Sequence, residues 1–167
     1  MSDKIELPIS KCREHAVIPK YANDGDAGMD IYAAEDVIVR PGCSVLVPTG
    51  LKMAIPYGYE VQIRPRSGIS LKTPLRVPNS PGTIDCGYRD EVNVIIYNAS
   101  VREDASEDEP FTLNDKGVKH GTYKICRGDR VAQMVIAKVE YCKPVVVDSV
   151  DDIGTNRGGG FGSTGIG

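Results

Sequence analysis

The sequence predicts an all-β protein that folds as a jelly-roll-like barrel or sandwich, with at most one short helix. Short runs rich in valine and isoleucine alternate with turns, and the 167 residues include 18 glycines and 11 prolines. No long stretch has the 3.6-residue apolar period of a surface helix. A chain of this length is typical of one domain with its own hydrophobic core.

Five segments have the composition of β-strands, and they lie at residues 44–49, 59–64, 91–97, 130–137 and 144–147. YEVQIR at 59–64 alternates apolar and polar residues, which favours a strand with one buried face and one solvated face. Turn signals separate the strands, namely PG at 41–42, PYG at 56–58 and NSPG at 79–82.

Two regions depart from this pattern of strands and turns. Residues 99–126 form a long polar connection, whose acidic side chains favour a solvated surface insertion over a partner-binding arm. Residues 153–167 are rich in glycine, which loses the most conformational freedom on ordering, and they are expected to form a flexible C-terminal arm. We therefore expect a β domain over residues 1–152, followed by this arm.

Composition argues against several classes of protein. The chain has 20 basic and 23 acidic residues, whereas a general nucleic-acid binder has a basic surplus, so we expect no nucleic-acid partner. No apolar run reaches membrane-spanning length, and the N-terminal residues have no signal-peptide core, so no membrane association is expected. The five cysteines form no C-x-x-C pair, which is typical of free thiols in a reducing compartment and predicts a cytoplasmic protein.

Five segments combine glycine with polar or charged residues. In DAGMDIYA at 26–33, two aspartates surround a glycine turn, and turn formation is an open alternative to a functional role. In RPRSG at 64–68, we expect Ser67 to cap a short helical turn. Amides, an arginine and a hydroxyl at such a turn suit a phosphate, although solvent-facing arginines beside a capped turn explain the segment equally well.

Two further segments lie in or beside strands. PGTIDCGYRDE at 81–91 predicts a hairpin that brings Asp85 and Tyr88 to one pocket, unless Asp85 only hydrogen-bonds the turn. In RGDRVAQMVI at 127–136, Gln133 lies among apolar residues. Its amide either satisfies a buried backbone group or binds a ligand.

The fifth segment is RGGGFGSTG at 157–165. It is not a Walker loop, because no Lys-Ser or Lys-Thr pair follows the glycines. Successive amides, together with the Arg157 charge and two hydroxyls, can still surround an oxyanion, and Phe161 can cover a planar base.

Taken in order, the five segments resemble the five motifs of the homotrimeric dUTP pyrophosphatases, or dUTPases. The matching stretches are AGMD at 27–30, PRSG at 65–68, GTIDCGYRDEV at 82–92, GDRVAQM at 128–134 and RGGGFGSTG at 157–165. The resemblance implies a jelly-roll homotrimer with active sites shared between subunits, which uses Mg²⁺ to hydrolyse dUTP to dUMP and pyrophosphate. Such an activity limits uracil incorporation into DNA and supplies dUMP for dTMP synthesis.

The resemblance also implies a role for each matching residue. Asp85 is the catalytic residue, which orients and deprotonates the water that attacks the α-phosphorus in line with the leaving group. Tyr88 packs on the deoxyribose and excludes a 2′-hydroxyl, with Asn79 near the uracil edge. Asp30 lies close to the Mg²⁺-bound triphosphate. The phosphate-binding residues are Arg66, Ser67, Gly68 and Gln133, and the arm that closes over the site of a neighbouring subunit contributes Arg157, Phe161, Gly162, Ser163 and Thr164.

Three departures from the family pattern concern uracil recognition and arm closure. Gly87 stands where the family usually has an aspartate, and Asp90 stands where glycine is usual. The spacing between Arg157 and Phe161 is also shorter than in the usual motif.

Two alternatives remain. A dCTP deaminase, or a bifunctional deaminase and dUTPase, shares the fold and has a hairpin similar to Asp85-Cys86-Gly87. Deamination needs a glutamate on the following strand, where this chain has Ile95, and an aliphatic side chain cannot transfer protons. The second alternative is a non-catalytic nucleotide-sensing module, against which Asp85 and the complete arm motif argue.

Overall fold

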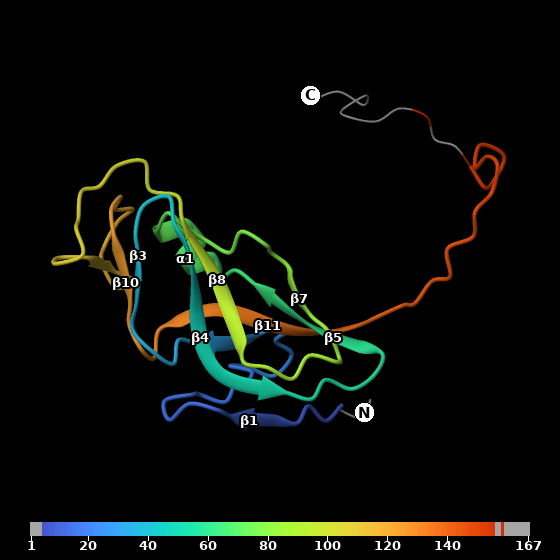
Figure 1. The fold of residues 1–167 in the computed structure, drawn as a ribbon, viewed down its shortest axis with the longest axis horizontal. Helices are drawn as coiled ribbons and strands as arrows, with labels where there is room; N and C mark the ends of the chain where they lie inside the picture. The colour runs from blue at the N-terminus through green and yellow to red at the C-terminus, as the bar shows by residue number, and fades with distance from the viewer. Residues whose placement is uncertain (1–4, 156–157, 159–167) are drawn as a thin grey trace.

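The computed structural model describes residues 5–155 and 158. Over these residues the chain forms eleven strands and one short helix, which confirms the predicted all-β class (Figure 1). In chain order the elements are β1 (Ile9–Lys11), β2 (Met29–Tyr32), β3 (Val37–Val39), β4 (Ser44–Met53), β5 (Tyr59–Arg64), α1 (Ser67–Lys72), β6 (Leu75–Arg76), β7 (Gly82–Ile84), β8 (Val92–Asn98), β9 (Phe111–Thr112), β10 (Tyr123–Ile125) and β11 (Arg130–Lys138).

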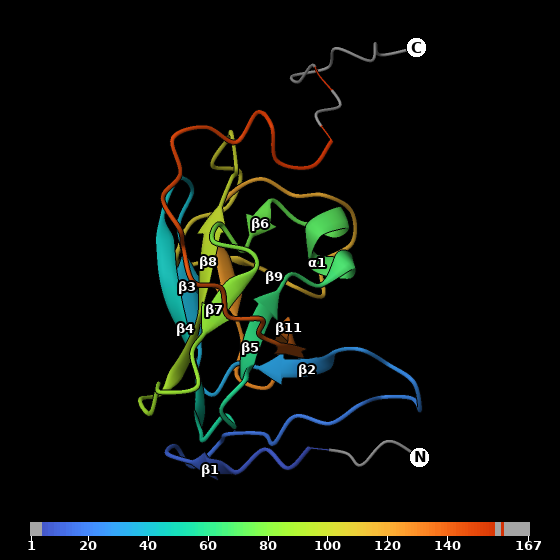
Figure 2. The same cartoon turned by 90° about the vertical axis from the view of Figure 1, so that its right-hand side faces the viewer.

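Two four-stranded antiparallel sheets form the body of the domain (Figure 2). One sheet has the strand order β1-β4-β8-β6, and the other has the order β2-β11-β5-β7. A third sheet, β3-β10-β9, has three strands and contains the parallel pair β9 and β10. Buried side chains from both four-stranded sheets belong to one hydrophobic core, as expected for a sandwich.

Strand alternation explains how the core forms. Along β8, buried residues alternate with half-buried ones, and Val92, Val94 and Ile96 are each at most 1% exposed. Ile31 on β2 and Val61 on β5 are fully buried and contribute from the other sheet. The period of two places every second side chain on the core face, so the expected strands at 44–49, 59–64, 91–97 and 130–137 are confirmed as parts of β4, β5, β8 and β11.

The polar connection at residues 99–126 contains β9 and β10, neither of which was expected from the sequence. The Thr122 N–H donates to the Ala105 carbonyl at 2.9 Å, and the Phe111 N–H donates to the Thr122 carbonyl at 2.9 Å. The Phe111 ring contacts the ring of the buried Tyr123. The acidic side chains stay exposed, whereas this apolar contact fastens the connection to the domain.

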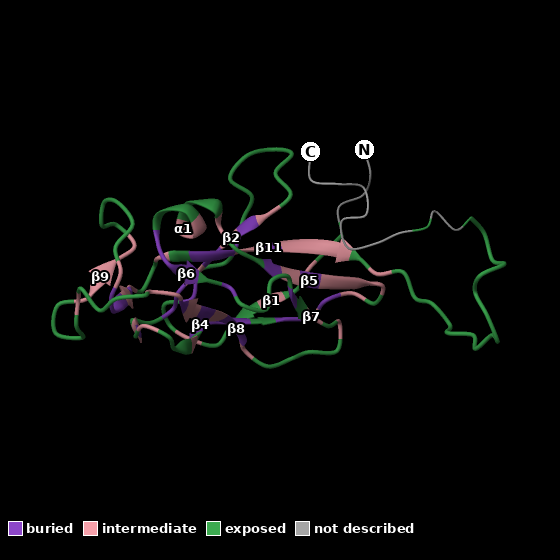
Figure 3. Cartoon of the chain, turned by 90° about the horizontal axis from the view of Figure 1, so that it is seen from above, coloured by how far each residue is buried: buried purple, intermediate pink, exposed green. Residues whose placement is uncertain are grey.

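The chain leaves the body after β11 as an irregular, mostly exposed segment (Figures 1 and 3). The strand expected at residues 144–147 is wrong, because this stretch has no strand pairing in the described chain. Val145 and Val146 are 73% and 97% exposed. Valine favours a strand only where a neighbouring strand supplies hydrogen bonds and side-chain contacts, and the ribbon of the described residues has none beside it.

Helix α1 follows β5 after a short bend. Arg66 is its N-cap residue, and no side chain caps the first turn. The expectation that Ser67 caps this turn is wrong, because Ser67 is the first helical residue, whereas a capping residue precedes the helix. Within residues 5–155 and 158, no helix has the length and apolar character needed to cross a bilayer.

Candidate functional site

The hairpin after β7 lines a pocket of about 310 Å³ between the two main sheets. Asp85 and Tyr88 are exposed at the two ends of a tight turn, in which the Tyr88 N–H donates to the Asp85 carbonyl at 3.0 Å. We call this cavity the hairpin pocket, and its lining residues are Leu46, Ile63, Asn79, Gly82, Thr83, Ile84, Asp85, Tyr88, Asn93 and Ile95.

Asn79 enters the hairpin pocket beside the start of β7. A Cβ built on Gly82 would lie 3.0 Å from Asn79 Nδ2. The missing side chain at Gly82 therefore makes room for the Asn79 amide. The pocket thus combines a carboxylate, a carboxamide and an aromatic ring, and Ile95 adds an aliphatic wall on β8.

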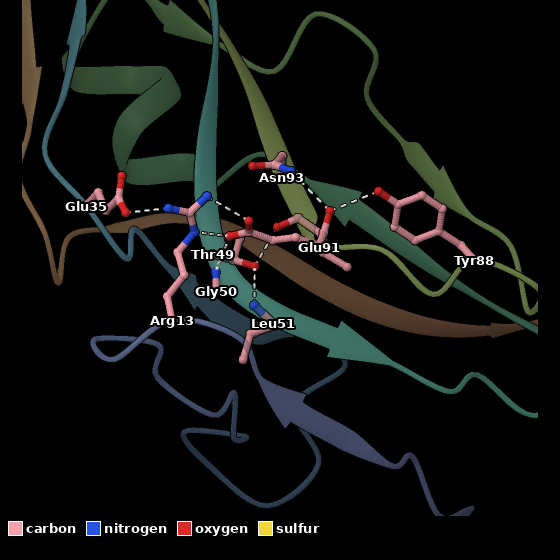
Figure 4. Close-up of polar contacts among 9 residues, drawn as sticks. Arg13, Glu35, Thr49, Gly50, Leu51, Tyr88, Glu91 and Asn93 are labelled. Atoms are coloured by element: carbon pink, nitrogen blue, oxygen red, sulfur yellow. Dashed lines mark hydrogen bonds and ion pairs between the residues drawn. The ribbon is translucent and has the colours of Figure 1, made fainter.

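The hairpin is braced by its own polar side chains (Figure 4). The Tyr88 hydroxyl donates to the Glu91 carbonyl at 2.9 Å, and Asn93 Nδ2 donates to the same carbonyl at 3.1 Å. The Arg89 guanidinium donates to the carbonyls of Cys86 and Tyr88 at 2.6 and 2.8 Å. The side chains therefore hold this exposed turn, because it has no ladder partner of its own.

Gly87, the first departure from the family pattern, has a backbone that other residues also adopt. Its φ lies outside the left-handed region, and a Cβ built on it would meet nothing within 4 Å. An aspartate at this position would fit the observed turn. The departure therefore does not force a different hairpin geometry.

A second pocket, of about 410 Å³, lies where β2 and β11 meet the bend before α1. Asp30 on β2 accepts hydrogen bonds from Arg66 Nε on Oδ1 at 2.8 Å and from Arg130 Nη1 on Oδ2 at 3.3 Å. Both arginines leave further N–H donors at this surface, which suits an anion. We call this cavity the arginine pocket, and its lining residues are Ala22, Asp26, Ala27, Gly28, Asp30, Arg66, Arg130 and Gln133.

Strand pairing sets the order of the side chains in the arginine pocket. Gln133 on β11 pairs with Asp30 on β2 and with Arg64 on β5. A Cβ on Gly28 would lie 3.0 Å from Gln133 Oε1, so this glycine leaves space for the amide. Gln133 is half-buried and lines the cavity, which supports its ligand-binding interpretation over a purely structural one.

The sequence-predicted residues thus fall into two groups. Asp30, Arg66 and Gln133 line the arginine pocket, and Ser67 and Gly68 are exposed in the adjoining first turn of α1. Asn79, Asp85 and Tyr88 line the hairpin pocket. As lined by the described residues, the two pockets share no residue.

Some predicted residues lie outside the described ranges, namely Arg157, Phe161, Gly162, Ser163 and Thr164. Sequence reasoning also missed Arg130, which pairs with Asp30 and lines the arginine pocket. Its signal was its place in GDRVAQM, three residues before Gln133 and on the same strand. Asp26 has the turn role left open above, because its Oδ2 accepts from the Asn23 N–H at 2.8 Å.

A dUTPase family model matches residues 14–104, which is more than half of the chain. The chain belongs to the dUTPase family. The resemblance drawn from the five motifs is therefore confirmed, and the matched range contains both the hairpin and the bend that carries Arg66.

Among relatives of this dUTPase-family chain are two proteins named deoxyuridine 5′-triphosphate nucleotidohydrolase. The protein from Ehrlichia canis (strain Jake) is 44% identical over 152 residues, which are 89% of this chain and 87% of the relative. The protein from Gloeothece citriformis (strain PCC 7424) is 42% identical over 165 residues, which are 97% of this chain and 98% of the relative.

Solved structures of phage dUTPases have a similar fold. One is a variant of the Staphylococcus bacteriophage 80alpha dUTPase with dUpNHpp, at a TM-score of 0.85 and 27% identity over 98% of this chain and 100% of that one. Another is a variant of the dUTPase from phage phi11 of S. aureus, described with a structural Mg(II) ion. Its TM-score is 0.78 at 29% identity, over 87% of this chain and 98% of that one.

The polar side chains of the described residues fit one way of binding a metal ion. Residues 5–155 and 158 contain no group of three or more histidine, cysteine or acidic side chains able to hold a metal ion. Both oxygens of Asp30 already accept hydrogen bonds from arginines. These residues fit a Mg²⁺ ion whose oxygen ligands come mainly from a phosphate chain and water.

Proposed function

We propose that this protein hydrolyses dUTP to dUMP and pyrophosphate. The observation that carries the proposal is the division of polar groups between the two pockets. The arginine pocket offers guanidinium groups to phosphate oxygens, and the hairpin pocket offers a carboxylate, a carboxamide and an aromatic ring to a nucleoside. Family membership supplies the substrate.

In this proposal, Asp85 accepts a proton from a water molecule and aligns that water for in-line attack on the α-phosphorus. The carboxylate is exposed at the turn and therefore open to solvent and substrate. Pyrophosphate is the leaving group, and the attacking oxygen remains on dUMP. Phosphoryl chemistry depends on positioning and on charge neutralisation, so the described pockets need no histidine.

The nucleoside binds in the hairpin pocket under the same proposal. The backbone of the turn, with Asn79 beside it, faces the uracil edge. The Tyr88 ring packs against the deoxyribose and leaves no room for a 2′-hydroxyl, because an added oxygen would collide with the ring. This exclusion selects dUTP over UTP.

The phosphate chain binds to Arg66, Gln133 and the first turn of α1, which begins with Ser67 and Gly68. When bound, Mg²⁺ would neutralise charge on the phosphates and on the leaving pyrophosphate. Asp30 takes part indirectly, by holding the guanidinium groups of Arg66 and Arg130 and by lying near the metal-bound phosphates.

Each working site combines pockets from different copies of the chain in a homotrimer. Two observations support this arrangement: the two pockets of one chain share no described lining residue, and the segment after β11, which leads to the arm, leaves the body with apolar side chains exposed. These side chains are Val145, Val146, Val150 and Ile153. Exposed apolar runs of this kind mark contacts with other chains.

The cytoplasm is the proposed location. The five cysteines are free thiols in the described chain. Unpaired cysteines are typical of a reducing compartment, where dUTP hydrolysis limits uracil incorporation into DNA and supplies dUMP for dTMP synthesis.

The deaminase alternative has less support than dUTP hydrolysis. Ile95 lines the same pocket as Asp85, at the position where deamination needs a glutamate. No proton-transferring group stands at this position, so we expect no ammonia release.

The test is a substrate panel with dUTP, dCTP, dTTP and UTP, with and without Mg²⁺, in which pyrophosphate and ammonia are both measured. We expect Mg²⁺-dependent pyrophosphate release from dUTP far above that from the other nucleotides. Ammonia from dCTP would establish deamination, and dUTP binding without either product would establish a nucleotide-sensing module.

A second experiment tests the shared site. Chains cut after Asn156 are mixed and refolded with Asp85→Asn chains, each inactive alone. A working site then takes its hairpin from a shortened chain and its arm from an Asp85→Asn chain. Random closed trimers give one half times one half, or about a quarter of the parental sites. Background activity in verified mixed trimers would contradict the shared-site proposal.

A further inference from the structure

A charged cluster lies behind the hairpin and outside both pockets (Figure 4). Arg13, in the segment after β1, donates to both carboxylate oxygens of Glu91. The Nε–Oε1 distance is 2.6 Å and the Nη2–Oε2 distance is 2.8 Å. Arg13 also pairs with Glu35 through Nη1. The planar guanidinium therefore makes a two-point contact with Glu91, which fixes orientation as well as distance.

The same carboxylate also accepts a backbone hydrogen bond from an irregular part of β4. The register of β4 against β8 shifts between Pro48 and Leu51, and the Gly50 N–H donates to Glu91 Oε1 at 2.8 Å. Gly50 has a φ of 69°, and a Cβ there would lie 2.6 Å from the Ala16 Cβ. Glycine is required here by its conformation and by the close approach of the N-terminal segment.

The pKa of Glu91 is lowered, first by the hydrogen bonds from Arg13 and then by the Gly50 N–H, although partial burial acts in the opposite direction. Its side chain is only 18% exposed. A carboxylate with three donors and little access to water has one favoured position. The Glu91 side chain is therefore held in one position at the base of the hairpin.

The backbone of Glu91 continues this chain of contacts into the hairpin pocket. Its carbonyl accepts the Tyr88 hydroxyl at 2.9 Å and Asn93 Nδ2 at 3.1 Å. Both donors belong to residues that line the pocket. One residue thus joins Arg13, through its carboxylate, to the Tyr88 ring, through its carbonyl.

We propose that Arg13 is a positioning residue for substrate specificity, which holds Glu91 and thereby the Tyr88 ring at the angle that excludes a 2′-hydroxyl. Arg13 touches no substrate. This inference rests on the proposed function, because that proposal assigns the sugar face to Tyr88. Its effect is on the ratio of kcat/KM values for dUTP and UTP more than on the chemical step at Asp85.

The experiment compares Arg13→Met with two controls in the full-length chain. Glu35→Gln removes the negative charge of the exposed partner of Arg13 and does not alter the two groups of the two-point contact with Glu91. Arg40→Met removes a separate surface ion pair, with Glu107. Thermal unfolding establishes that each variant is folded before its activity is measured.

Two readouts follow the Tyr88 ring and its effect. The first is the ¹⁹F resonance of protein labelled with 3-fluorotyrosine, in which Tyr88→Phe identifies the signal. We expect this resonance to shift or broaden in Arg13→Met and to stay unchanged in both controls. The second is the dUTP-to-UTP ratio of kcat/KM, which we expect to fall about tenfold in Arg13→Met and to stay within about twofold in the controls.

Each outcome decides the proposal. An unchanged Tyr88 resonance in folded Arg13→Met contradicts the positioning role, whatever the activity. A shifted resonance with an unchanged ratio contradicts the specificity role. Arg13→Lys is expected to restore part of the ratio, because it returns the charge without the two-point geometry. If the parent does not hydrolyse dUTP, the proposed function fails, while the ¹⁹F comparison still decides whether Arg13 positions Tyr88.

Discussion

The two pockets of this dUTPase-family chain are built from different kinds of structure. In the arginine pocket, Asp30, Arg130 and Gln133 lie on the paired strands β2 and β11, whose register fixes their positions. The hairpin pocket places Asp85 and Tyr88 on an exposed turn held by side-chain hydrogen bonds. The comparison teaches that strand pairing itself places Asp30, Arg130 and Gln133. The exposed hairpin that carries Asp85 and Tyr88 depends instead on side-chain hydrogen bonds for its position.

The difference predicts how each pocket responds to substitution. A change in the arginine pocket removes a donor and leaves the ladder in place. A substitution behind the hairpin keeps all the side chains that line the hairpin pocket, but it alters their orientation. The predictions below separate these two responses, starting from the largest effect.

Asp85→Asn removes the carboxylate from the hairpin and keeps its size. We expect kcat for dUTP to fall roughly 10²–10⁴-fold, because a positioned general base contributes about that much. Binding of dUTP is expected to stay near the parental level. Pyrophosphate release and calorimetric titration measure the two quantities, and near-parental turnover would show that another group activates the water.

Arg66→Met tests the arginine pocket. The change removes a charged donor, and hydrogen bonds to charged groups contribute about 1.5–3 kcal/mol, so we expect kcat/KM to fall roughly 10- to 150-fold, mainly through KM. Arg64→Met is the matched control, since Arg64 donates to Gln62 Oε1 and does not line the arginine pocket as described. Equal losses in the two variants would remove the specific role of Arg66.

The contact between Arg13 and Glu91 behind the hairpin is an ion pair, so its contribution to stability depends on pH. The native-state pKa of Glu91 is lowered by Arg13, below the value of about 4.3 for an unfolded glutamate. Its stabilisation is therefore complete above that value and is lost as the pH falls through the native pKa. We expect the Tm difference between the parent and Arg13→Met to be largest near pH 7 and to shrink below about pH 4. A Tm difference between the two proteins that stays constant from pH 7 to pH 3 would contradict a stabilising ion pair between Arg13 and Glu91.

Gly87→Ala is expected to have the smallest effect. The φ of Gly87 is not left-handed and the space around its Cβ is open, so alanine reduces the freedom of the unfolded chain without strain. We expect a gain of about 0.4–1 kcal/mol in the free energy of unfolding, measured by urea denaturation. Gly50→Ala is the opposite control, because its left-handed φ and the 2.6 Å approach to Ala16 make it destabilising. A loss of stability in Gly87→Ala would show that the turn needs glycine.

Much of the fold was predictable, because strand alternation and turn residues are local signals. The strands β4, β5, β8 and β11 follow from valine and isoleucine periodicity. The short strands β9 and β10 were missed, since each depends on pairing rather than on its own composition. The opposite error occurred at residues 144–147, where a valine-rich run pairs with no strand of residues 5–155.

The candidate site was predictable to the level of residues but not of geometry. The motifs identified Asp30, Arg66 and Gln133, which line one pocket, and the hairpin residues, which line another. No local pattern indicated that Arg13 contacts Glu91 across 78 positions of sequence. A contact of this kind arises only when β1 and β4 pair and bring the N-terminal segment beside the hairpin.

The connection at residues 99–126 also has a practical consequence. Its tip, residues 106–110, lies between Ala105 and Phe111, both of which are hydrogen-bonded to Thr122. Sequence added within the tip leaves these two anchor points in place, and doubling the length of such a loop costs only about 0.6 kcal/mol. The ribbon places this end of the domain far from the point where the arm leaves (Figures 1 and 3). The tip is therefore a natural attachment point for a fluorophore or an affinity peptide.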